Sequence, residues 1–257
     1  MSESGEVAVL IPAAGEGTRL GGRRKQFRIL GNKPVLVQTL YVFERHPDVD
    51  HIIVATPEEA VEPLRDELRR VGITKLQSVV AGGATRQESV SAALAHTSDD
   101  VEVILVHDAV RPFVRLFQVS DIIQSVRRHG AAALAVPVTD SVRRSDGFTF
   151  METVPRENLY RMQTPQGFRR DWLVKAYTWA GETGVVATDD VELIQRAGFA
   201  VRCVVGSNVN VKITTRDDWD RAMQFWPVWE ESLHLEDVEL EGIRGGAGDG
   251  RKREVRT

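Results

Sequence analysis

The sequence is poor in several features that mark particular classes of protein. Of its 257 residues one is a cysteine, 7% are aromatic, and the formal net charge is -4. A lone cysteine cannot form a disulfide within the chain, so a disulfide-stapled scaffold is excluded. No run approaches the roughly 18 consecutive apolar residues of a membrane span, and no overall basic field would attract DNA or RNA. We therefore predict a protein that binds neither membrane nor nucleic acid and whose anion sites are local.

The amino terminus and the cysteine together predict a cytoplasmic location. Residues 1–6 are polar and acidic, unlike the basic and then apolar start of a secretory signal. Cys203 stands in the apolar run 200–205, where we expect a small buried side chain rather than a reactive thiol. A reducing compartment suits both features.

Alternating short runs of β-branched residues and amphipathic segments predict an α/β fold. The strand-like runs are almost continuously apolar, as in a mainly parallel sheet that helices flank on both faces. In such a sheet, ligands bind at the carboxyl ends of the strands. The predicted strands are 7–11, 51–55, 79–81, 101–106, 132–138 and 201–205.

Three threonines are predicted to cap helices. Thr56, Thr85 and Thr215 each precede an acidic residue by three positions. A threonine oxygen can accept a hydrogen bond from the third backbone N–H of a helix, and the acid can return one to the threonine N–H. Helices are therefore expected to start directly after these threonines.

Two segments depart from the alternating pattern. Residues 138–163 contain Asp-Gly and scattered charges without helical periodicity, which predicts a protruding β-hairpin arm with its turn near 145–147. Beyond residue 227 the chain becomes acidic over 228–240 and then rich in glycine and arginine. We predict one domain over 1–227 and a helix followed by a disordered tail over 228–257.

The loop after the first strand, 12–26, is glycine-rich and cationic. Gly15 and Gly17 allow backbone N–H groups to face an anion, and four cations between Arg19 and Lys25 supply opposing charge, so a polyphosphate is the natural ligand. The dinucleotide fingerprint fails at Leu20, and the Walker pattern fails because an arginine follows Gly22. On the glycine pattern alone, a surface turn with solvated arginines stays open.

Five segments occur in the order and spacing of a known family. They are 12–19 (PAAGEGTR) with Lys25, 106–112 (VHDAVRP), 163–168 (QTPQGF), 188–190 (TDD) and 211–214 (VKIT). From about residue 7 to residue 226 the chain resembles the 2-C-methyl-D-erythritol 4-phosphate cytidylyltransferases. The resemblance implies a Rossmann-like nucleotidyltransferase fold, CTP and a polyol phosphate as substrates, Mg²⁺ as cofactor, and a homodimer in which the arm contributes to the partner's substrate site.

The resemblance also implies roles for individual residues. Expected in catalysis are Arg19, Lys25 and Lys212; in nucleotide binding, Ala13, Ala14, Gly15, Gly17, Gly82, Gly83, Ser89, Asp108 and Ala109; and in polyol phosphate binding, Arg111, Ser141, Arg156 and Thr164. Asp108 is also the candidate metal ligand, with Mg²⁺ held mostly through the CTP phosphates. The chain departs from the family pattern at Ala84 and Val209, where members often carry polar or acidic residues.

Bland alternatives exist for two of these residues. Lys212 by itself fits a solvated lysine at a strand end, and Asp108 fits an aspartate that caps a loop. His107 is expected to be packed, because no second histidine or cysteine stands at ligand spacing.

Two other functions remain: a ribitol-5-phosphate cytidylyltransferase, and a nucleotide-binding protein without turnover. Charge on both sides of the α-phosphate, from Arg19, Lys25 and Lys212, disfavours the second.

Overall fold

The computed structural model describes residues 5–15 and 24–246, with side chains up to residue 233. Within these residues, seven strands form one sheet in the order β11-β7-β10-β6-β1-β4-β5. Only β10 opposes the others, since it pairs antiparallel with both β6 and β7. The strands are β1 (Glu6–Pro12), β4 (His51–Thr56), β5 (Leu76–Ala81), β6 (Val101–Val106), β7 (Ala131–Pro137), β10 (Tyr160–Arg169) and β11 (Arg202–Val205). The mainly parallel sheet and its six predicted strands are confirmed.

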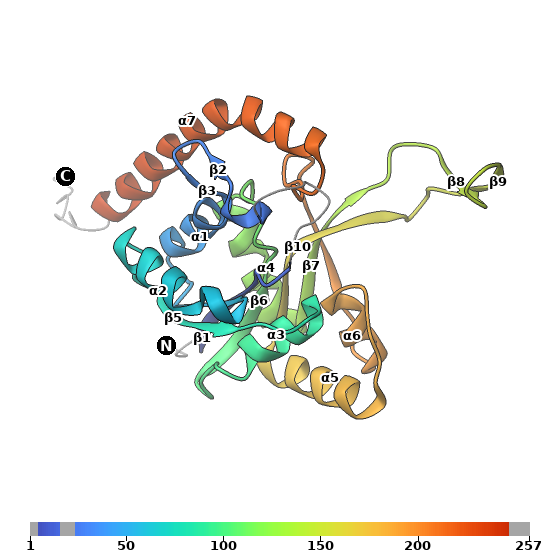
Figure 1. Cartoon of the computed structure of the whole chain (residues 1–257), viewed down its shortest axis with the longest axis horizontal. Helices are drawn as coiled ribbons and strands as arrows, with labels where there is room; N and C mark the ends of the chain where they lie inside the picture. The colour runs from blue at the N-terminus through green and yellow to red at the C-terminus, as the bar shows by residue number, and fades with distance from the viewer. Residues whose placement is uncertain (1–4, 16–23, 247–257) are drawn as a thin grey trace, which may run out of the picture.

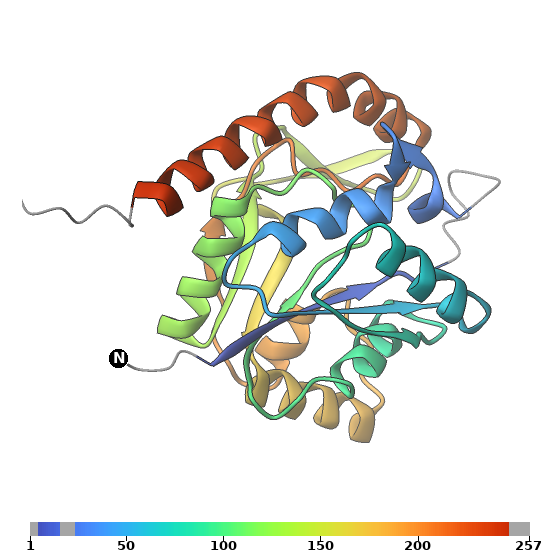
Figure 2. The ribbon, with the colours of Figure 1, turned by 90° about the vertical axis from the view of Figure 1, so that its left-hand side faces the viewer.

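Helices cover both faces of this sheet (Figures 1 and 2). Alternation along β1 divides the core: Val7, Val9 and Ile11 face one set of helices, and Ala8 and Leu10 face the other. One set is α1 (Val35–Arg45), α2 (Val61–Arg70) and α4 (Leu116–His129). The other is α3 (Arg86–Leu94), α5 (Arg170–Thr183) and α6 (Asp190–Arg196). This explains why the strands read as continuously apolar.

A long carboxyl-terminal helix, α7 (Arg216–Gly246), packs on a small hairpin formed by β2 (Ile29–Leu30) and β3 (Lys33–Pro34). Gly31 turns this hairpin with a φ of +63°, and a Cβ there would lie 2.1 Å from Trp226 Nε1. Trp226 and Trp229 are buried with Phe113. The helix therefore runs through the domain boundary predicted at residue 227, and the tail predicted to be disordered lies beyond residue 246, outside the described residues.

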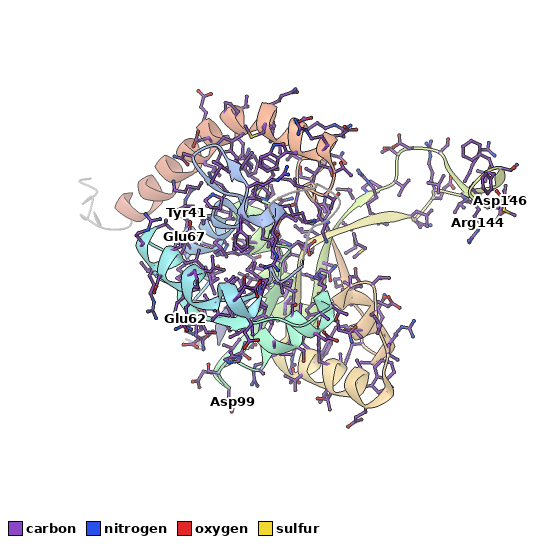
Figure 3. The ribbon with its side chains drawn as sticks, in the orientation of Figure 1. Tyr41, Glu62, Glu67, Asp99, Arg144 and Asp146 are labelled. Atoms are coloured by element: carbon purple, nitrogen blue, oxygen red, sulfur yellow. The ribbon has the colours of Figure 1, made fainter. Side chains whose placement is uncertain are left out.

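The arm is a hairpin that projects from the body (Figure 1). Its strands are β8 (Val142–Ser145) and β9 (Phe150–Val154), and the Asp146 carboxylate closes the turn by accepting from the backbone N–H groups of Phe148 and Thr149. Arg144 and Asp146 lie at its far end, away from the rest of the chain (Figure 3). The hairpin is confirmed, although residues from Tyr160 onward, which were predicted as arm, belong to the central strand β10.

The predicted burial of Cys203 and the predicted helix cap at Thr56 were wrong. The predicted caps at Thr85 and Thr215 are confirmed. Cys203 is exposed, because it lies in β11 at the edge of the sheet. Thr56 ends β4 with its Oγ1 buried and unpartnered, and Pro57 precedes the short 3-10 helix η3 (Glu58–Ala60) instead. Thr85 does form a reciprocal cap with Glu88, and Thr215 accepts from the N–H of Asp218 at 3.2 Å.

Among the helices of the described ranges, none combines the length and the apolar character that crossing a bilayer requires.

Candidate active site

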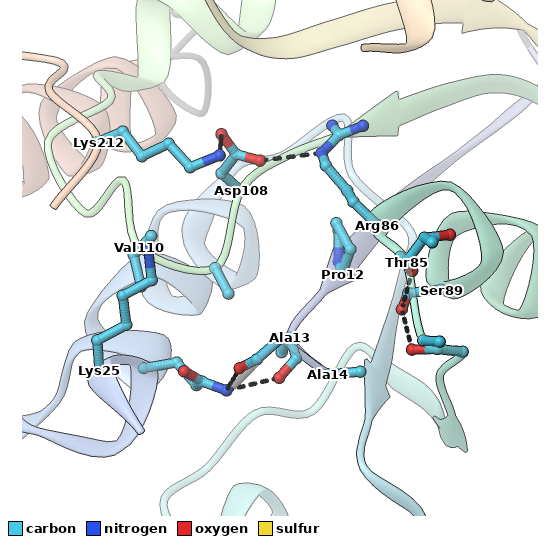
Figure 4. Close-up of a pocket in the computed structure, with 15 residues that line it drawn as sticks. Pro12, Ala13, Ala14, Lys25, Thr85, Arg86, Ser89, Asp108, Val110 and Lys212 are labelled. Atoms are coloured by element: carbon cyan, nitrogen blue, oxygen red, sulfur yellow. Dashed lines mark hydrogen bonds and ion pairs between the residues drawn. The ribbon is translucent and has the colours of Figure 1, made fainter. Parts of the chain in front are cut away.

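The loops that follow β1, β5 and β6 converge at the carboxyl edge of the sheet and enclose a cavity of about 280 Å³ (Figure 4). The convergence follows from topology, since these strands run parallel and their loops leave the same edge. The residues lining the cavity are Pro12, Ala13, Ala14, Gly15, Lys25, Gln26, Gly83, Ala84, Thr85, Arg86, Ser89, Asp108, Ala109, Val110 and Lys212.

Hydrogen bonds from a glutamine side chain to backbone carbonyls fix the β1 side of the cavity. The buried Gln26 amide donates to Ala13 O at 2.7 Å and to Gly15 O at 3.1 Å, which holds the described part of the loop in a tight curve. Gln26 belongs to the short 3-10 helix η2 (Lys25–Phe27), and this helix brings Lys25 to the cavity. The predicted residues Gly17 and Arg19 lie outside the described residues.

Close backbone packing shapes the β5 side. A Cβ on Gly82 would lie 2.6 Å from Ala14 Cβ and 2.8 Å from Ser89 Oγ, so a larger residue would push the two loops apart. Gly82 lies behind the wall, while Gly83 and Ser89 line the cavity. Ser89 Oγ donates to Thr85 O at 2.9 Å and keeps its lone pairs for other donors.

A cluster of charges forms the β6 side. Asp108, which is 6% exposed, pairs with Arg86 Nε through Oδ1 at 3.2 Å, and with Arg111 Nε at 3.2 Å and Lys212 Nζ at 3.1 Å through Oδ2. Burial acts to raise the pKa of this carboxyl, but the charges of Lys212, Arg86 and Arg111 outweigh it and hold the pKa far below its usual range. Asp108 is therefore a permanent anion that anchors Lys212 at the cavity.

His107 confirms the prediction of a packed histidine. It is fully buried, and its ring nitrogens lie 3.1 Å from Thr164 Oγ1 and 3.0 Å from Arg111 O. Burial lowers its pKa to about 4. A neutral imidazole in these contacts supports the loop rather than carrying charge to a ligand.

A second pocket of about 120 Å³ adjoins the main cavity. Arg86, Asp108 and Lys212 line both spaces, so these three side chains form the partition between them. Arg111 and Thr164 line the second pocket, where Arg111 Nη1 donates to Asn210 O at 2.8 Å. Two of the four residues predicted to bind a polyol phosphate therefore lie together, next to the cavity.

The other two, Ser141 and Arg156, lie on the arm and line neither space. Both are exposed, and the Arg156 guanidinium donates to Thr139 O at the base of the arm. Within one chain, the arm therefore does not complete the second pocket.

The donor set of the cavity bears on metal binding. Among the described residues, no group of three histidine, cysteine, aspartate or glutamate side chains could hold a metal ion by itself. Of the described residues that line the cavity, Asp108 is the one carboxylate, and both its oxygens already contact cations. A metal ion held chiefly by oxygens of a bound triphosphate fits this arrangement, whereas a protein-built cage does not.

Sequence patterns did not reveal the structural importance of Gln26, Arg86 and Asp190. Gln26 follows Lys25 directly, and its spacing from the glycines was a usable signal. Arg86 lay in a stretch interpreted as a helix cap, yet it bridges Asp108 and Asp190. Its partner Asp190 is 104 positions away, so no local pattern could reveal the pair.

Comparisons with known proteins agree with this geometry. Residues 7–226 match the family model described as 2-C-methyl-D-erythritol 4-phosphate cytidylyltransferase. The chain is 54% identical, over 88% of its length and 95% of the relative, to the protein of that name from Salinibacter ruber. It is 40% identical to the one from Halalkalibacterium halodurans, over 83% of this chain and 93% of the relative.

Solved structures give the same result. The crystal structure of 2-C-methyl-D-erythritol 4-phosphate cytidylyltransferase from Thermus thermophilus superposes with a TM-score of 0.74 at 35% identity, covering 86% of this chain and 99% of that one. The corresponding synthase from Anaerococcus prevotii gives a TM-score of 0.75 at 27% identity, with 86% and 98% covered. The chain belongs to the 2-C-methyl-D-erythritol 4-phosphate cytidylyltransferase family.

Proposed function

We propose that the protein transfers CMP from CTP to 2-C-methyl-D-erythritol 4-phosphate, a step in the synthesis of isoprenoid precursors. A phosphate oxygen of the polyol phosphate attacks the α-phosphorus, the bond from the α-phosphorus to the bridging oxygen of the β-phosphate breaks, and pyrophosphate leaves. The observation that carries the proposal is the pair Lys25 and Lys212, which reach one cavity from separate walls in a chain of this family (Figure 4).

The chemistry calls for positive charge rather than a general base. The attacking phosphate is already ionised near neutral pH, so the barrier lies in bringing anions together and in the charge that develops at the α-phosphorus. Lys25 faces the triphosphate side, for which Arg19 is also a proposed catalytic residue, and Lys212 acts from the side of the second pocket. Because Lys212 lines both spaces, its ammonium can contact the nucleotide and the incoming phosphate together.

The nucleotide is held mostly by backbone. Ala13, Ala14, Gly15 and Gly17 supply the phosphate loop, and Gly82, Gly83 and Ser89 read the pyrimidine edge. Gly82 packs against Ala14, so the base-binding loop and the phosphate loop are held in a fixed relation. Asp108 and Ala109 complete the nucleotide site at the end of β6.

Magnesium is the proposed cofactor. Triphosphate oxygens would supply most of its ligands, and Asp108 is the carboxylate that the described lining of the cavity offers. When bound, magnesium would neutralise phosphate charge and would make the α-phosphorus more electrophilic. The chain's own cations then orient the two substrates.

The polyol phosphate binds in the second pocket, and a second subunit completes that pocket. Arg111 supplies charge, and Thr164 supplies a hydroxyl. Ser141 and Arg156 would come from the partner's arm, which makes the active form a homodimer. Two features support this: the exposed arm carries Phe148 and Phe150, fully and 79% exposed, and an isolated hairpin is only marginally stable. The cytoplasmic location stays a prediction.

Pyrophosphate release tests the proposal. Mg-CTP is paired with 2-C-methyl-D-erythritol 4-phosphate, with ribitol 5-phosphate, and with neither, and UTP replaces CTP in a parallel series. We expect release only with CTP and the methylerythritol substrate. Preference for ribitol 5-phosphate would overturn the substrate, and CTP binding without release from any pair would overturn the enzyme in favour of a nucleotide-binding protein.

A further inference from the structure

One buried carboxylate beside the site has no assigned task. Asp190 is fully buried and lines neither the main cavity nor the second pocket. Its Oδ2 accepts from Arg86 Nη1 at 2.8 Å, and its Oδ1 accepts from the Tyr177 hydroxyl at 2.5 Å. An ionised carboxylate in such a place is costly unless cations and donors satisfy it, so these contacts define what it does.

The carboxylate is held rigidly where α6 begins. The neighbouring Asp189 caps the helix by accepting from the N–H of Glu192 at 2.9 Å. Gln166 of the central strand β10 donates to Asp189 at 2.9 Å and accepts from the N–H of Val191 at 3.3 Å. These hydrogen bonds therefore anchor the start of α6, and with it Asp190, to the central sheet rather than to a surface loop.

Arg86 is divided between two carboxylates. Its Nη1 lies 2.8 Å from Asp190, and its Nε lies 3.2 Å from Asp108, so two edges of one planar guanidinium are fixed at once. Asp108 then contacts Lys212 through its other oxygen at 3.1 Å. A continuous series of ion pairs runs from the start of α6 to the lysine at the cavity.

We propose that Asp190 is a positioning residue for nucleotidyl transfer, because it holds Arg86 in the plane that fixes Asp108 and, through Asp108, Lys212. The inference rests on the proposed function and deepens it, since it assigns the placement of one reacting cation to a residue outside the site. Without the Asp190 charge, Arg86 has Asp108 as its remaining carboxylate partner. It then moves fully onto Asp108 and competes there with Lys212.

A purely structural role makes a different prediction. Tyr177 lies on α5, and its bond to Asp190 joins α5 to α6. If Asp190 merely anchored these helices, loss of the Tyr177 hydroxyl would harm the enzyme as much as loss of the Asp190 charge. The effect of losing the Asp190 charge would also be the same whether or not Arg86 is present.

The test is a double-mutant cycle on the full chain. We compare pyrophosphate release, at saturating concentrations of Mg-CTP and the polyol phosphate, in four variants. They are Asp190→Asn, Arg86→Gln, their combination and the control Tyr177→Phe. We expect Asp190→Asn to lower kcat on the order of 30-fold in the wild-type background but less than about 2-fold in the Arg86→Gln background, as coupled residues do. Tyr177→Phe should change kcat by less than about 3-fold.

A charge-conserving variant guards against misfolding. Asp190→Asn leaves a mostly buried guanidinium short of a partner, so it can fail to fold; Arg86→Lys keeps the charge but cannot bridge both carboxylates. We expect Arg86→Lys to lower kcat as Asp190→Asn does. Equal losses from Asp190→Asn in both backgrounds, a Tyr177→Phe loss as large as that of Asp190→Asn, or full activity of Arg86→Lys would each overturn the inference.

A readout without turnover separates this inference from the proposed function. The lysines are dimethylated with ¹³C-formaldehyde, and the NMR signal of Lys212 is assigned by its loss in Lys212→Ala. We expect that signal to move in Arg86→Lys and to stay in place in Tyr177→Phe. An unmoved signal in Arg86→Lys would overturn the positioning role, even if no substrate pair gave turnover.

Discussion

Lys25 and Lys212 face the same cavity, yet the chain holds them by different physical means. Lys25 belongs to a three-residue 3-10 helix, and the next residue of that helix, Gln26, is fixed by neutral hydrogen bonds to Ala13 O and Gly15 O. Lys212 belongs to an irregular segment and is fixed by a buried anion, with Ile213 N donating to Val110 O at 3.0 Å beside it. The β1 wall therefore depends on backbone shape, and the β6 wall depends on a balance of charges.

The largest effect on kcat is expected at the β6 wall. Lys212→Ala removes the cation shared by both pockets, and we expect kcat to fall roughly 100- to 1,000-fold, as for loss of one donor that stabilises developing charge. CTP affinity, measured by calorimetry, should change far less. The fold should survive, because Arg86 and Arg111 still neutralise Asp108. A kcat within about 3-fold of the wild type would contradict the role of Lys212.

The variant Lys25→Ala tests the β1 wall. This lysine faces the triphosphate, so we expect about a 100-fold loss of kcat accompanied by weaker CTP binding, unlike Lys212→Ala. Steady-state kinetics with both substrates varied give the comparison. If the two variants lost kcat and CTP affinity in the same proportion, the proposed division of labour between the walls would be wrong.

Gln26→Glu disturbs the shape of the β1 wall without touching Lys25. A carboxylate would face two carbonyl oxygens that now accept hydrogen bonds from the amide, and unsatisfied acceptors of this kind cost about 1–3 kcal/mol. We expect the CTP KM to rise about 30-fold. Gln38→Glu is the matched control: its amide donates to Leu30 O in the β2–β3 hairpin, away from the cavity lining. An unchanged KM in Gln26→Glu would show that the loop does not need this amide.

The arm provides a smaller and more selective change. Arg156→Ala should raise the KM for the polyol phosphate about 10-fold and the CTP KM less than about 2-fold, because charged hydrogen bonds contribute about 1.5–3 kcal/mol. Arg144→Ala is the control, since Arg144 lies at the far end of the arm and pairs with Glu152 (Figure 3). A larger effect on CTP than on the polyol phosphate would remove the arm from the substrate site.

The smallest effect near neutral pH is expected in the free energy of unfolding. Burial lowers the pKa of His107 and of His46 to about 4, so both are neutral in the folded protein at pH 6. The unfolded chain protonates them near pH 6.5, so it binds more protons than the folded chain between about pH 6.5 and 4. Urea unfolding should therefore show stability falling as pH drops from 7 to 4.5. A flat profile over that range would contradict the neutral burial of both rings.

The sequence predicted what local patterns encode. The apolar runs became strands, Thr85 formed its cap, and the Asp-Gly segment became the hairpin. The quoted motifs also brought Lys25, Asp108 and Lys212 to one cavity, because parallel strands deliver their loops to a common edge.

What the sequence did not predict depends on distant pairing. Strand β10 contains glycine, proline and glutamine and gains its place only by pairing with β6 and β7. The exposure of Cys203 follows from β11 being an edge strand, which is a property of strand order. The bridge from Asp190 through Arg86 to Asp108 joins residues from three separate segments, and only the fold brings them together.

A crystal structure of the protein with CTP would test most directly whether the two walls act on one phosphate. We predict that the α-phosphate lies between the walls, with Lys25 Nζ on the triphosphate side and with Lys212 Nζ within about 3 Å of an α-phosphate oxygen while it stays paired with Asp108. A triphosphate bound outside this cavity, or one whose α-phosphate has Lys25 and Lys212 on the same side, would contradict it.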